Sequence, residues 1–321
     1  MEIRNTTESR SVVERAFSVL GVFSGRDHSL SVSDISRLSG LPVATAHRMA
    51  TKLVSLRVLE RGEGGRYTIG LRLWELAAHA PRHRALRAAA LPHMLRLHEK
   101  TKATVNLSVR DGAEGIWLES LGWGGPVRVA PMTVGDRFPL HTTASGNVLL
   151  AYASPDAQED ILARTPTRHT AGAVPDPLVL RRIVSQVRRS GYAAGDFRTE
   201  RCTFAVAAPL RDRDGAVIAS LSLVTDPAGA GGPRCVGPLL ATAVRISRKI
   251  ATAQDREGGI PHQWAHAQGG RPIPLHTFRG TEAATESDAA SAMGSAVERA
   301  VVSAVGAVGE GGMETTLIRH P

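Results

Sequence analysis

The chain has 321 residues, enough for about two domains of ordinary size, and its 39 lysines and arginines outnumber its 30 aspartates and glutamates. The basic excess lies entirely in residues 1–255, which favours a polyanionic partner for that part of the chain. Two cysteines, a polar N-terminal segment and the lack of an apolar run of about 18 residues exclude a disulfide framework and a membrane span, so we expect a cytoplasmic protein.

The first predicted elements are three short helices. Residues 11–24 carry apolar side chains at helical spacing, which predicts a helix with an inner stripe of Val12, Val13, Ala16, Val19, Leu20 and Phe23. Ser31 is a suitable cap for a second helix, and Gly40 suits its left-handed end. Pro42 fits the first turn of a third helix, whose inner face is formed by Ala46, Met49, Ala50 and Leu53.

A hairpin is predicted after these helices. Val58 and Leu59 precede a glycine-rich turn, and Tyr67 and Ile69 follow it. Helix, turn, helix and hairpin in this order are typical of a winged helix-turn-helix. We therefore expect a DNA-binding domain over residues 9–70, followed by a linker helix over 71–83 that Pro81 interrupts.

The third helix is the candidate for reading DNA, because a helix fits the major groove and its outer side is polar. We expect contacts with double-stranded DNA from this helix and the hairpin, through Thr45, His47, Arg48, Thr51, Lys52, Arg61 and Arg66. Arg48 would bind guanine edges or phosphate, and Arg61 and Arg66 would bind backbone phosphate. The alternative is that these charges form an ordinary solvated surface.

Residues 84–254 predict a second domain of the α+β class with a mixed or antiparallel sheet. A helix over 84–100 precedes two strands around the Asp111-Gly112 turn. The segment VGDRFPLHTT is expected to be a loop that leads to a helix over 144–153, capped by Thr142 or Thr143. Further predicted elements are a strand over 126–132, a helix over 178–191, a hairpin around Asp214-Gly215 and a helix over 236–253. Residues 255–321, rich in Gly, Ala, Ser and Glu, are expected to form a mostly disordered tail.

Residues 11–253 resemble the IclR family of bacterial transcriptional regulators. The resemblance is carried by LSVSDISRLSGLPVATAHRMATKLVSLRVLER with GGRYTIG, and by VGDRFPLHTTASGNVLLA, RRSGYAAGD and FAVAAPLRDRDGAVIASLSL. It implies a homodimer or tetramer, a palindromic operator, and a mixed α/β, GAF/PAS-like domain that binds a small organic effector, aromatic or carboxylic. A repressor is the expectation, and an activator is the alternative.

The resemblance also implies effector-binding positions, which fall here on Ala130, Phe138, Ala144, Ser145, Asp196, Thr203, Ala205 and Ser222. Backbone amides at the start of the helix at Ala144 can receive a carboxylate. The chain departs from the family in keeping only Asp196 of an acidic run and in having Val224 at a second serine position. These losses favour an apolar or aromatic effector over a small keto or hydroxy acid. The alternatives are that these residues only fill the core, or that the chain acts on DNA without an effector.

Catalysis is a weaker interpretation of the same segment. His141, Ser145, Asp136 and Cys202 are the residue types of a nucleophilic site, but no GxSxG elbow surrounds Ser145. The twelve histidines show no metal-ligand spacing. We therefore expect no enzyme activity, no metal and no cofactor, and an enzyme with a DNA-binding appendage is the remaining alternative.

Overall fold

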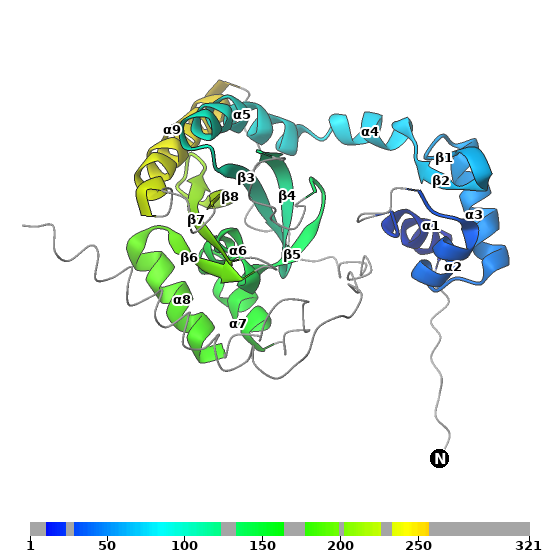
Figure 1. Ribbon diagram of the computed structural model, residues 1–321, viewed down its shortest axis with the longest axis horizontal. Helices are drawn as coiled ribbons and strands as arrows, with labels where there is room; N and C mark the ends of the chain where they lie inside the picture. The colour runs from blue at the N-terminus through cyan, green and yellow to red at the C-terminus, as the bar shows by residue number, and fades with distance from the viewer. Residues whose placement is uncertain are drawn as a thin grey trace, which may run out of the picture. The chain divides into compact units, whose positions relative to one another are not determined.

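The computed structural model forms two compact units, and the division between them lies in helix α5, between Leu86 and Arg87 (Figure 1). The residues that the structure describes are 11–23, 29–122, 133–163, 177–198, 202–225 and 233–256. The strand predicted over 126–132 and nearly all of the predicted tail lie outside these residues.

The first unit has the predicted order of elements. These are α1 (Val12–Gly21), α2 (Val32–Ser39), α3 (Val43–Ser55), β1 (Leu59–Arg61), a 3-10 turn (Glu63–Gly65), β2 (Tyr67–Ile69) and α4 (Leu71–Ala78). Strands β1 and β2 pair antiparallel, with Leu59 opposite Ile69, and Leu30 adds a bridge to Tyr67. Gly40 ends α2 with φ of 70°, as predicted, whereas Pro42 is the residue before the first turn of α3 rather than part of that turn.

The core of this unit joins its helices to the hairpin. Its centre is formed by Val19, Ile35, Ala46, Ala50, Leu53, Leu59 and Tyr67. Met49 is only half-buried. The predicted inner stripe of α1 is wrong at its first turn, because Val12 and Val13 are 64% and 65% exposed and only the later residues of the helix reach the core. The first turn of α1 therefore presents apolar side chains to its surroundings.

The second unit is built on one six-stranded antiparallel sheet with the order β5-β4-β3-β8-β7-β6. The strands are β3 (Thr104–Asp111), β4 (Glu114–Leu121), β5 (Arg137–Pro139), β6 (Ala193–Arg198), β7 (Cys202–Arg211) and β8 (Val217–Thr225). The predicted glycine turns are present, since Gly112 and Gly215 have φ of 60° and 81°. The expectation that VGDRFPLHTT is only a loop is wrong, because Arg137–Pro139 pairs with β4.

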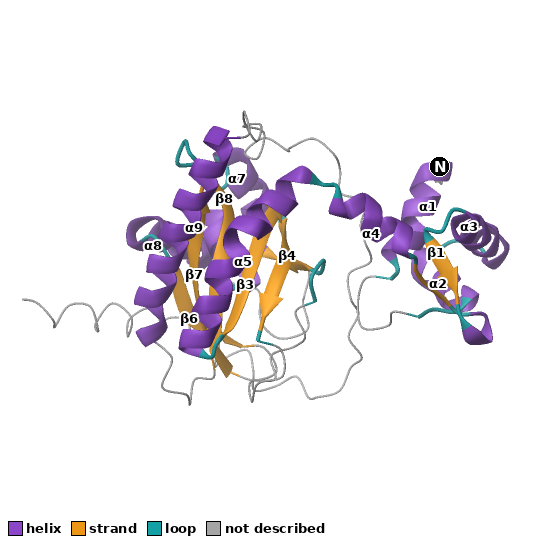
Figure 2. Ribbon diagram, turned by 90° about the horizontal axis from the view of Figure 1, so that it is seen from above, coloured by secondary structure: helices purple, strands orange, loops and turns teal. Residues whose placement is uncertain are grey.

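Helices cover both faces of the sheet (Figure 2). One face lies against α5 (Pro81–Thr101) and α9 (Val236–Arg256), and the other lies against α6 (Ala144–Ala151), α7 (Pro155–Ala163) and α8 (Pro177–Ser190). Short 3-10 turns, Leu140–Thr142 and Pro233–Cys235, precede α6 and α9. Helix α5 begins earlier than the predicted residue 84 because proline suits a first helical turn. We refer below to the α6 face and the α9 face of the sheet.

Helix α6 is held at its first turn. The side chain of Thr143 accepts a hydrogen bond of 2.9 Å from the Gly146 amide, which identifies it as the cap, whereas Thr142 donates to the Pro139 carbonyl. Gly146 lies so close to the preceding turn that a Cβ atom there would be 2.1 Å from the Leu140 carbonyl oxygen. A glycine is therefore required for α6 to begin where it does.

The last turn of α6 is held from two neighbouring helices. The Gln158 amide of α7 donates to the carbonyls of Leu150, Ala151 and Ala153 at 2.8, 3.0 and 3.1 Å. The Arg188 Nε of α8 donates to the Ala151 carbonyl at 2.7 Å. These bonds satisfy carbonyls that a helix end leaves without partners within the helix.

Candidate nucleic-acid interface and ligand site

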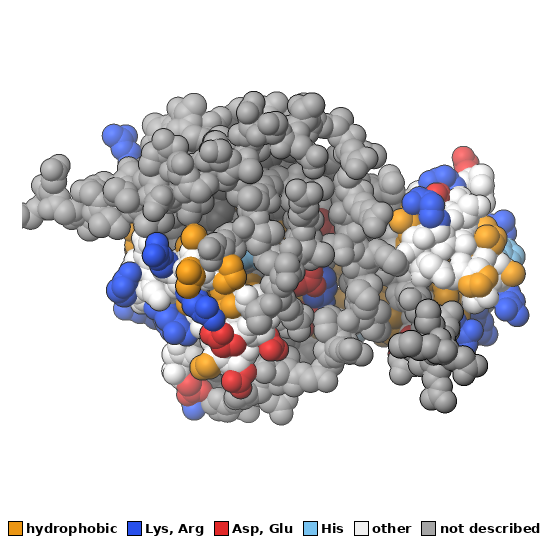
Figure 3. Space-filling model, turned by 90° about the horizontal axis from the view of Figure 1, so that it is seen from below, with side chains coloured by type: hydrophobic (Ala, Val, Ile, Leu, Met, Phe, Trp, Pro, Cys, Tyr) orange, Lys and Arg blue, Asp and Glu red, His pale blue; other side chains and the backbone are white. Residues whose placement is uncertain are grey.

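The outer side of α3 is polar and basic. Its apolar side buries Ala46, Ala50 and Leu53 in the core of the first unit. The predicted contact residues lie on the other side, where Thr45 is half-buried and the rest are exposed, namely His47, Arg48, Thr51 and Lys52. Residues 43–55 contain no aspartate or glutamate. Basic side chains are visible at the surface of this unit in Figure 3.

Arg48 and Lys52 keep their charges available. Within the described ranges, neither residue forms an ion pair, in contrast to Arg37 of α2, which lies 3.3 Å from Asp34. A guanidinium group without a carboxylate partner offers five N–H donors in a planar arrangement, which suits guanine edges and phosphate oxygens. The exposed side of α3 therefore has the chemistry of a surface that binds DNA.

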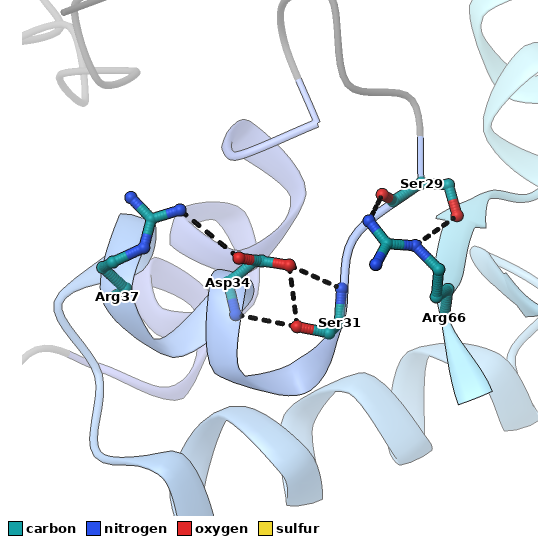
Figure 4. A network of polar contacts seen from close by, with 5 residues as sticks. All are labelled: Ser29, Ser31, Asp34, Arg37 and Arg66. Carbon is teal, nitrogen blue, oxygen red and sulfur yellow. Dashed lines mark hydrogen bonds and ion pairs between the residues drawn. The ribbon is translucent and has the colours of Figure 1, made fainter. Parts of the chain in front are cut away.

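The two arginines of the hairpin are both exposed but differ in their contacts. The Arg61 guanidinium lies over the Tyr67 ring at 5.9 Å from its centroid. Arg66 donates from Nε to the Ser29 hydroxyl at 3.2 Å and from Nη2 to the Ser29 carbonyl (Figure 4). Arg66 thus connects the hairpin to the segment before α2, and only its remaining N–H groups are available to bind another molecule.

The start of α2 carries a closed polar network (Figure 4). The Ser31 hydroxyl accepts from the Asp34 amide at 3.2 Å, and the Asp34 carboxylate accepts from the Ser31 amide at 3.1 Å, which is the predicted cap in its reciprocal form. The hydrogen bond from the Ser31 side chain, followed by that from its backbone, lowers the pKa of Asp34. The network fixes the first turn of the helix that packs on α3.

In the second unit, the predicted ligand residues gather on the α6 face. Phe138 stacks on Trp117 with ring centroids 4.1 Å apart, and both are buried. Ala144 and Ser145 begin α6 and are 2% and 1% exposed. Their amides belong to a first helical turn, whose N–H groups have no intrahelical acceptor and can receive an anion.

The remaining predicted ligand residues lie on the strands or outside the described part. Ala205 of β7 and Ser222 of β8 are buried on the α6 face, next to Val224. Asp196 of β6 pairs with Phe204 of β7, and Thr203 of β7 pairs with Phe197 of β6. The structure does not describe the side chains of Asp196 and Thr203. Ala130 also lies outside the described residues.

Around the predicted Ser222, sequence reasoning missed four polar side chains on this same face, of which Asn106, Ser108 and Ser220 are buried and Ser120 is half-buried. Asn106 of β3 pairs with Ser222 of β8, and Ser108 pairs with Ser220. Ser120 of β4 lies opposite Asn106 and donates to its Oδ1 atom at 2.7 Å. We call these five residues the polar row. The signal in the sequence was the alternation of small polar and aliphatic residues in VNLSV and ASLSL.

Nothing in the described part supports a nucleophilic site at Ser145. Its hydroxyl is buried and has no hydrogen-bond partner among the described residues, so no base is positioned to activate it there. No group of three potential metal ligands occurs within those residues either. None of the helices that the structure describes has the length and apolar character needed to cross a membrane.

Comparison with known proteins identifies both units. Residues 12–63 match the IclR helix-turn-helix domain, and residues 78–248 match the C-terminal part of the bacterial transcriptional regulator IclR. The chain is 30% identical over 215 residues to the HTH-type transcriptional regulator XynR of Escherichia coli (strain K12), covering 66% of this chain and 85% of XynR. It is 28% identical over 214 residues to the HTH-type transcriptional repressor AllR of the same strain, covering 66% of this chain and 78% of AllR.

A solved structure is similar over both units. The crystal structure of an IclR homolog complexed with 4-hydroxybenzoate, from Microbacterium hydrocarbonoxydans, is 35% identical to this chain with a TM-score of 0.69. The match covers 75% of this chain and 99% of that structure.

Proposed function

Because this chain belongs to the IclR family of bacterial transcriptional regulators, we propose that α3 reads an operator and that the second unit binds a small organic effector controlling this contact. The observation that carries the proposal is the outer side of α3. This side is exposed, basic and free of acidic residues. Helix α3 is the second helix of a helix-turn-helix that is followed by a hairpin. A bacterial regulator of this kind acts in the cytoplasm, where its operator lies.

The DNA contacts follow from this geometry. A helix laid in the major groove brings the N-terminal part of its outer side to base edges. Thr45, His47 and Arg48 are then the base-reading residues, and Thr51 and Lys52 lie further along the groove. Arg61 and the free N–H groups of Arg66 contact phosphates beside the groove, as the hairpin of a winged helix does.

We propose a palindromic operator bound by a homodimer or a tetramer. Two α3 helices related by a two-fold axis would meet half-sites one DNA turn apart, about 34 to 36 Å. The domain division that goes with this assembly is residues 9–70 for DNA, 71–83 as a linker and 84–254 for effector binding and oligomerisation. Exposed apolar side chains support self-association, since Val12, Val13 and Phe17 of α1 and Leu71 and Trp74 of α4 are between 54% and 69% exposed.

The proposed effector is a small aromatic carboxylate, and the proposed control is repression. Binding of 4-hydroxybenzoate by the similar Microbacterium protein supports the effector class, and the repressor AllR supports repression. In this chain the carboxylate would lie at the amides of Ala144 and Ser145, with the ring between the aromatic pair Trp117 and Phe138 and the small side chain of Ala205. The second unit is then a sensor and not an enzyme.

The proposal is tested first on DNA. Replacing Arg48 with alanine should weaken operator binding by about 1 to 3 kcal/mol, the usual loss of one arginine contact with a base pair. Arg181→Ala is the control, since Arg181 is an exposed arginine of α8 paired with Glu159. Gel-shift titration with a fragment of the promoter region gives both affinities. Equal binding by the Arg48→Ala variant and the wild type would show that α3 does not read DNA through this face.

The effector is tested by thermal shift with aromatic carboxylates. A ligand at about 100 times its dissociation constant stabilises the folded protein by about 2.7 kcal/mol. A shift without turnover of the compound supports a sensor. Turnover would instead favour an enzyme with a DNA-binding unit, and the absence of any shift across the series would favour a regulator that acts by occupying DNA alone.

A further inference from the structure

The two faces of the central strands differ in chemistry although helices cover both. On the α9 face, β3 and β8 carry aliphatic side chains that are fully buried, among them Val105, Leu107, Leu221 and Leu223. On the α6 face, the same strands carry Asn106, Ser108, Ser220 and Ser222, which are at most 2% exposed. A buried polar group that lacks a partner reduces stability, so a sheet face selected for packing alone would be apolar.

The polar row is continuous across three neighbouring strands. Asn106 lies between Ser120 of β4 and Ser222 of β8, and Ser108 lies opposite Ser220. The Oδ1 atom of Asn106 is satisfied by Ser120. Within the described residues, the Nδ2 group of Asn106 and the hydroxyls of Ser108, Ser220 and Ser222 have no hydrogen-bond partner. Donors and acceptors of adjacent strands thus lie side by side without a hydrogen-bond partner in the described part of the protein.

The row carries no formal charge. Among the described buried residues, Glu119 is the one acidic or basic side chain, and it lies opposite Leu107, on the α9 face, where it pairs with Arg87. A carboxylate placed on the row would lose its hydration without gaining a counter-charge. An uncharged hydroxyl group both donates and accepts hydrogen bonds, as the amide and the serines of the row require.

The row also lies beside the aromatic wall of the proposed site. Trp117, which stacks on Phe138, is the cross-strand neighbour of Ser108 on β4. On the other side, Ala207 of β7 is the neighbour of Ser222, and it belongs to the same buried cluster as Phe138 and Ala144. Helix α6 packs against β3, β4, β7 and β8 over this region.

We infer that the polar row binds an uncharged hydroxyl group of the effector, so that the protein distinguishes a hydroxylated aromatic acid from the same acid without the hydroxyl. This inference rests on the proposed function, in which the carboxylate lies at the start of α6. The polar row then binds the neutral hydroxyl group at one end of the ligand, and the start of α6 binds the carboxylate at the other end.

The experiment is a calorimetric titration with 4-hydroxybenzoate and with benzoate. We expect the wild type to bind 4-hydroxybenzoate at least about tenfold more tightly, since each neutral hydrogen bond contributes a factor of about 2 to 10. In a variant carrying Ser108→Ala and Ser220→Ala, the ratio of the two affinities should fall below about threefold, with the affinity for benzoate kept. The control is Thr242→Val, which removes a buried hydroxyl of α9 that already donates to the Pro238 carbonyl at 2.8 Å.

Thermal unfolding of the free protein separates a ligand-reading role from a structural one. Because the two serine hydroxyls have no hydrogen-bond partner among the residues that the structure describes, their removal should leave the melting temperature unchanged or raise it. A lower melting temperature with an unchanged affinity ratio would assign the serines to the fold and overturn the inference. Equal affinity of the wild type for the two acids would overturn the inference alone, whereas no binding of either acid would overturn the proposed effector class as well.

Discussion

Replacing Gly146 with alanine tests how closely α6 is seated on the turn before it. A Cβ atom at this position would lie 2.1 Å from the oxygen, 2.6 Å from the carbon and 2.7 Å from the Cα atom of Leu140. All three are backbone atoms, so no side-chain rotation relieves the clash. The start of α6 would have to move by more than an ångström to restore ordinary contact.

The magnitude follows from two opposing effects. Overpacking of this kind costs about 1 to 3 kcal/mol, whereas alanine in a helix gains about 0.5 to 1 kcal/mol over glycine. We expect a net loss of about 1 to 2 kcal/mol in the free energy of unfolding, which corresponds to a fall of about 2 to 8 °C in Tm for a unit of this size. Effector binding should weaken as well, because the amides of Ala144 and Ser145 move with the turn.

The matched control is Gly237→Ala in α9. A Cβ atom there meets nothing within 4 Å, so the same substitution should be neutral or slightly stabilising. Differential scanning calorimetry of the wild type and the two variants gives the comparison. If the Gly146→Ala variant unfolds at the same temperature as the Gly237→Ala variant, α6 is not seated as tightly as the structure indicates.

Three further outcomes are expected. Ser31→Ala should lower the stability of the first unit by about 1 kcal/mol through loss of the helix cap, while Ser33→Ala, on the exposed side of α2, should leave it unchanged in urea unfolding. Since the folded pKa of Asp34 lies below its ordinary value of 3.8, its contribution to stability is complete at neutral pH and is lost as the pH falls through the folded pKa. Wild type and Asp34→Asn should therefore converge in stability in acid, and a constant difference would contradict this account. Removal of residues 257–321 should leave operator affinity within about twofold, because the basic excess lies in the preceding residues, and a larger loss in a gel shift would make the tail part of the binding unit.

The parts of the structure that were predicted correctly depend on short-range chemistry. Ser31 caps α2 through a residue three positions away, and Gly40 ends the same helix by its own backbone angle. The glycine turns at Gly112 and Gly215 are equally local, and they define two hairpins of the sheet. Such signals can be read from neighbouring letters of the sequence.

The parts that were missed depend on pairing between distant segments. Asn106 and Ser222 become neighbours only when β3 and β8 pair, and the residues adjacent to them in the sequence do not specify the register of that pairing. The strand at Arg137–Pro139 was missed for the same reason, since it exists by pairing with β4. The first turn of α1 shows the opposite error, because Val12 and Val13 have helical spacing but are largely exposed and do not reach the core.

The anchoring of α6 by Gln158 and Arg188 has a mechanical consequence. In this helix of eight residues, the last two carbonyls, those of Leu150 and Ala151, accept side-chain hydrogen bonds from α7 and α8, which opposes unravelling at that end. A ligand that displaces Ala144 would then tilt α6 as a whole, and α7 and α8 would move with it. Helices α7 and α8, which would move when the site is occupied, are therefore already attached by hydrogen bonds to α6, the helix that would contact the ligand.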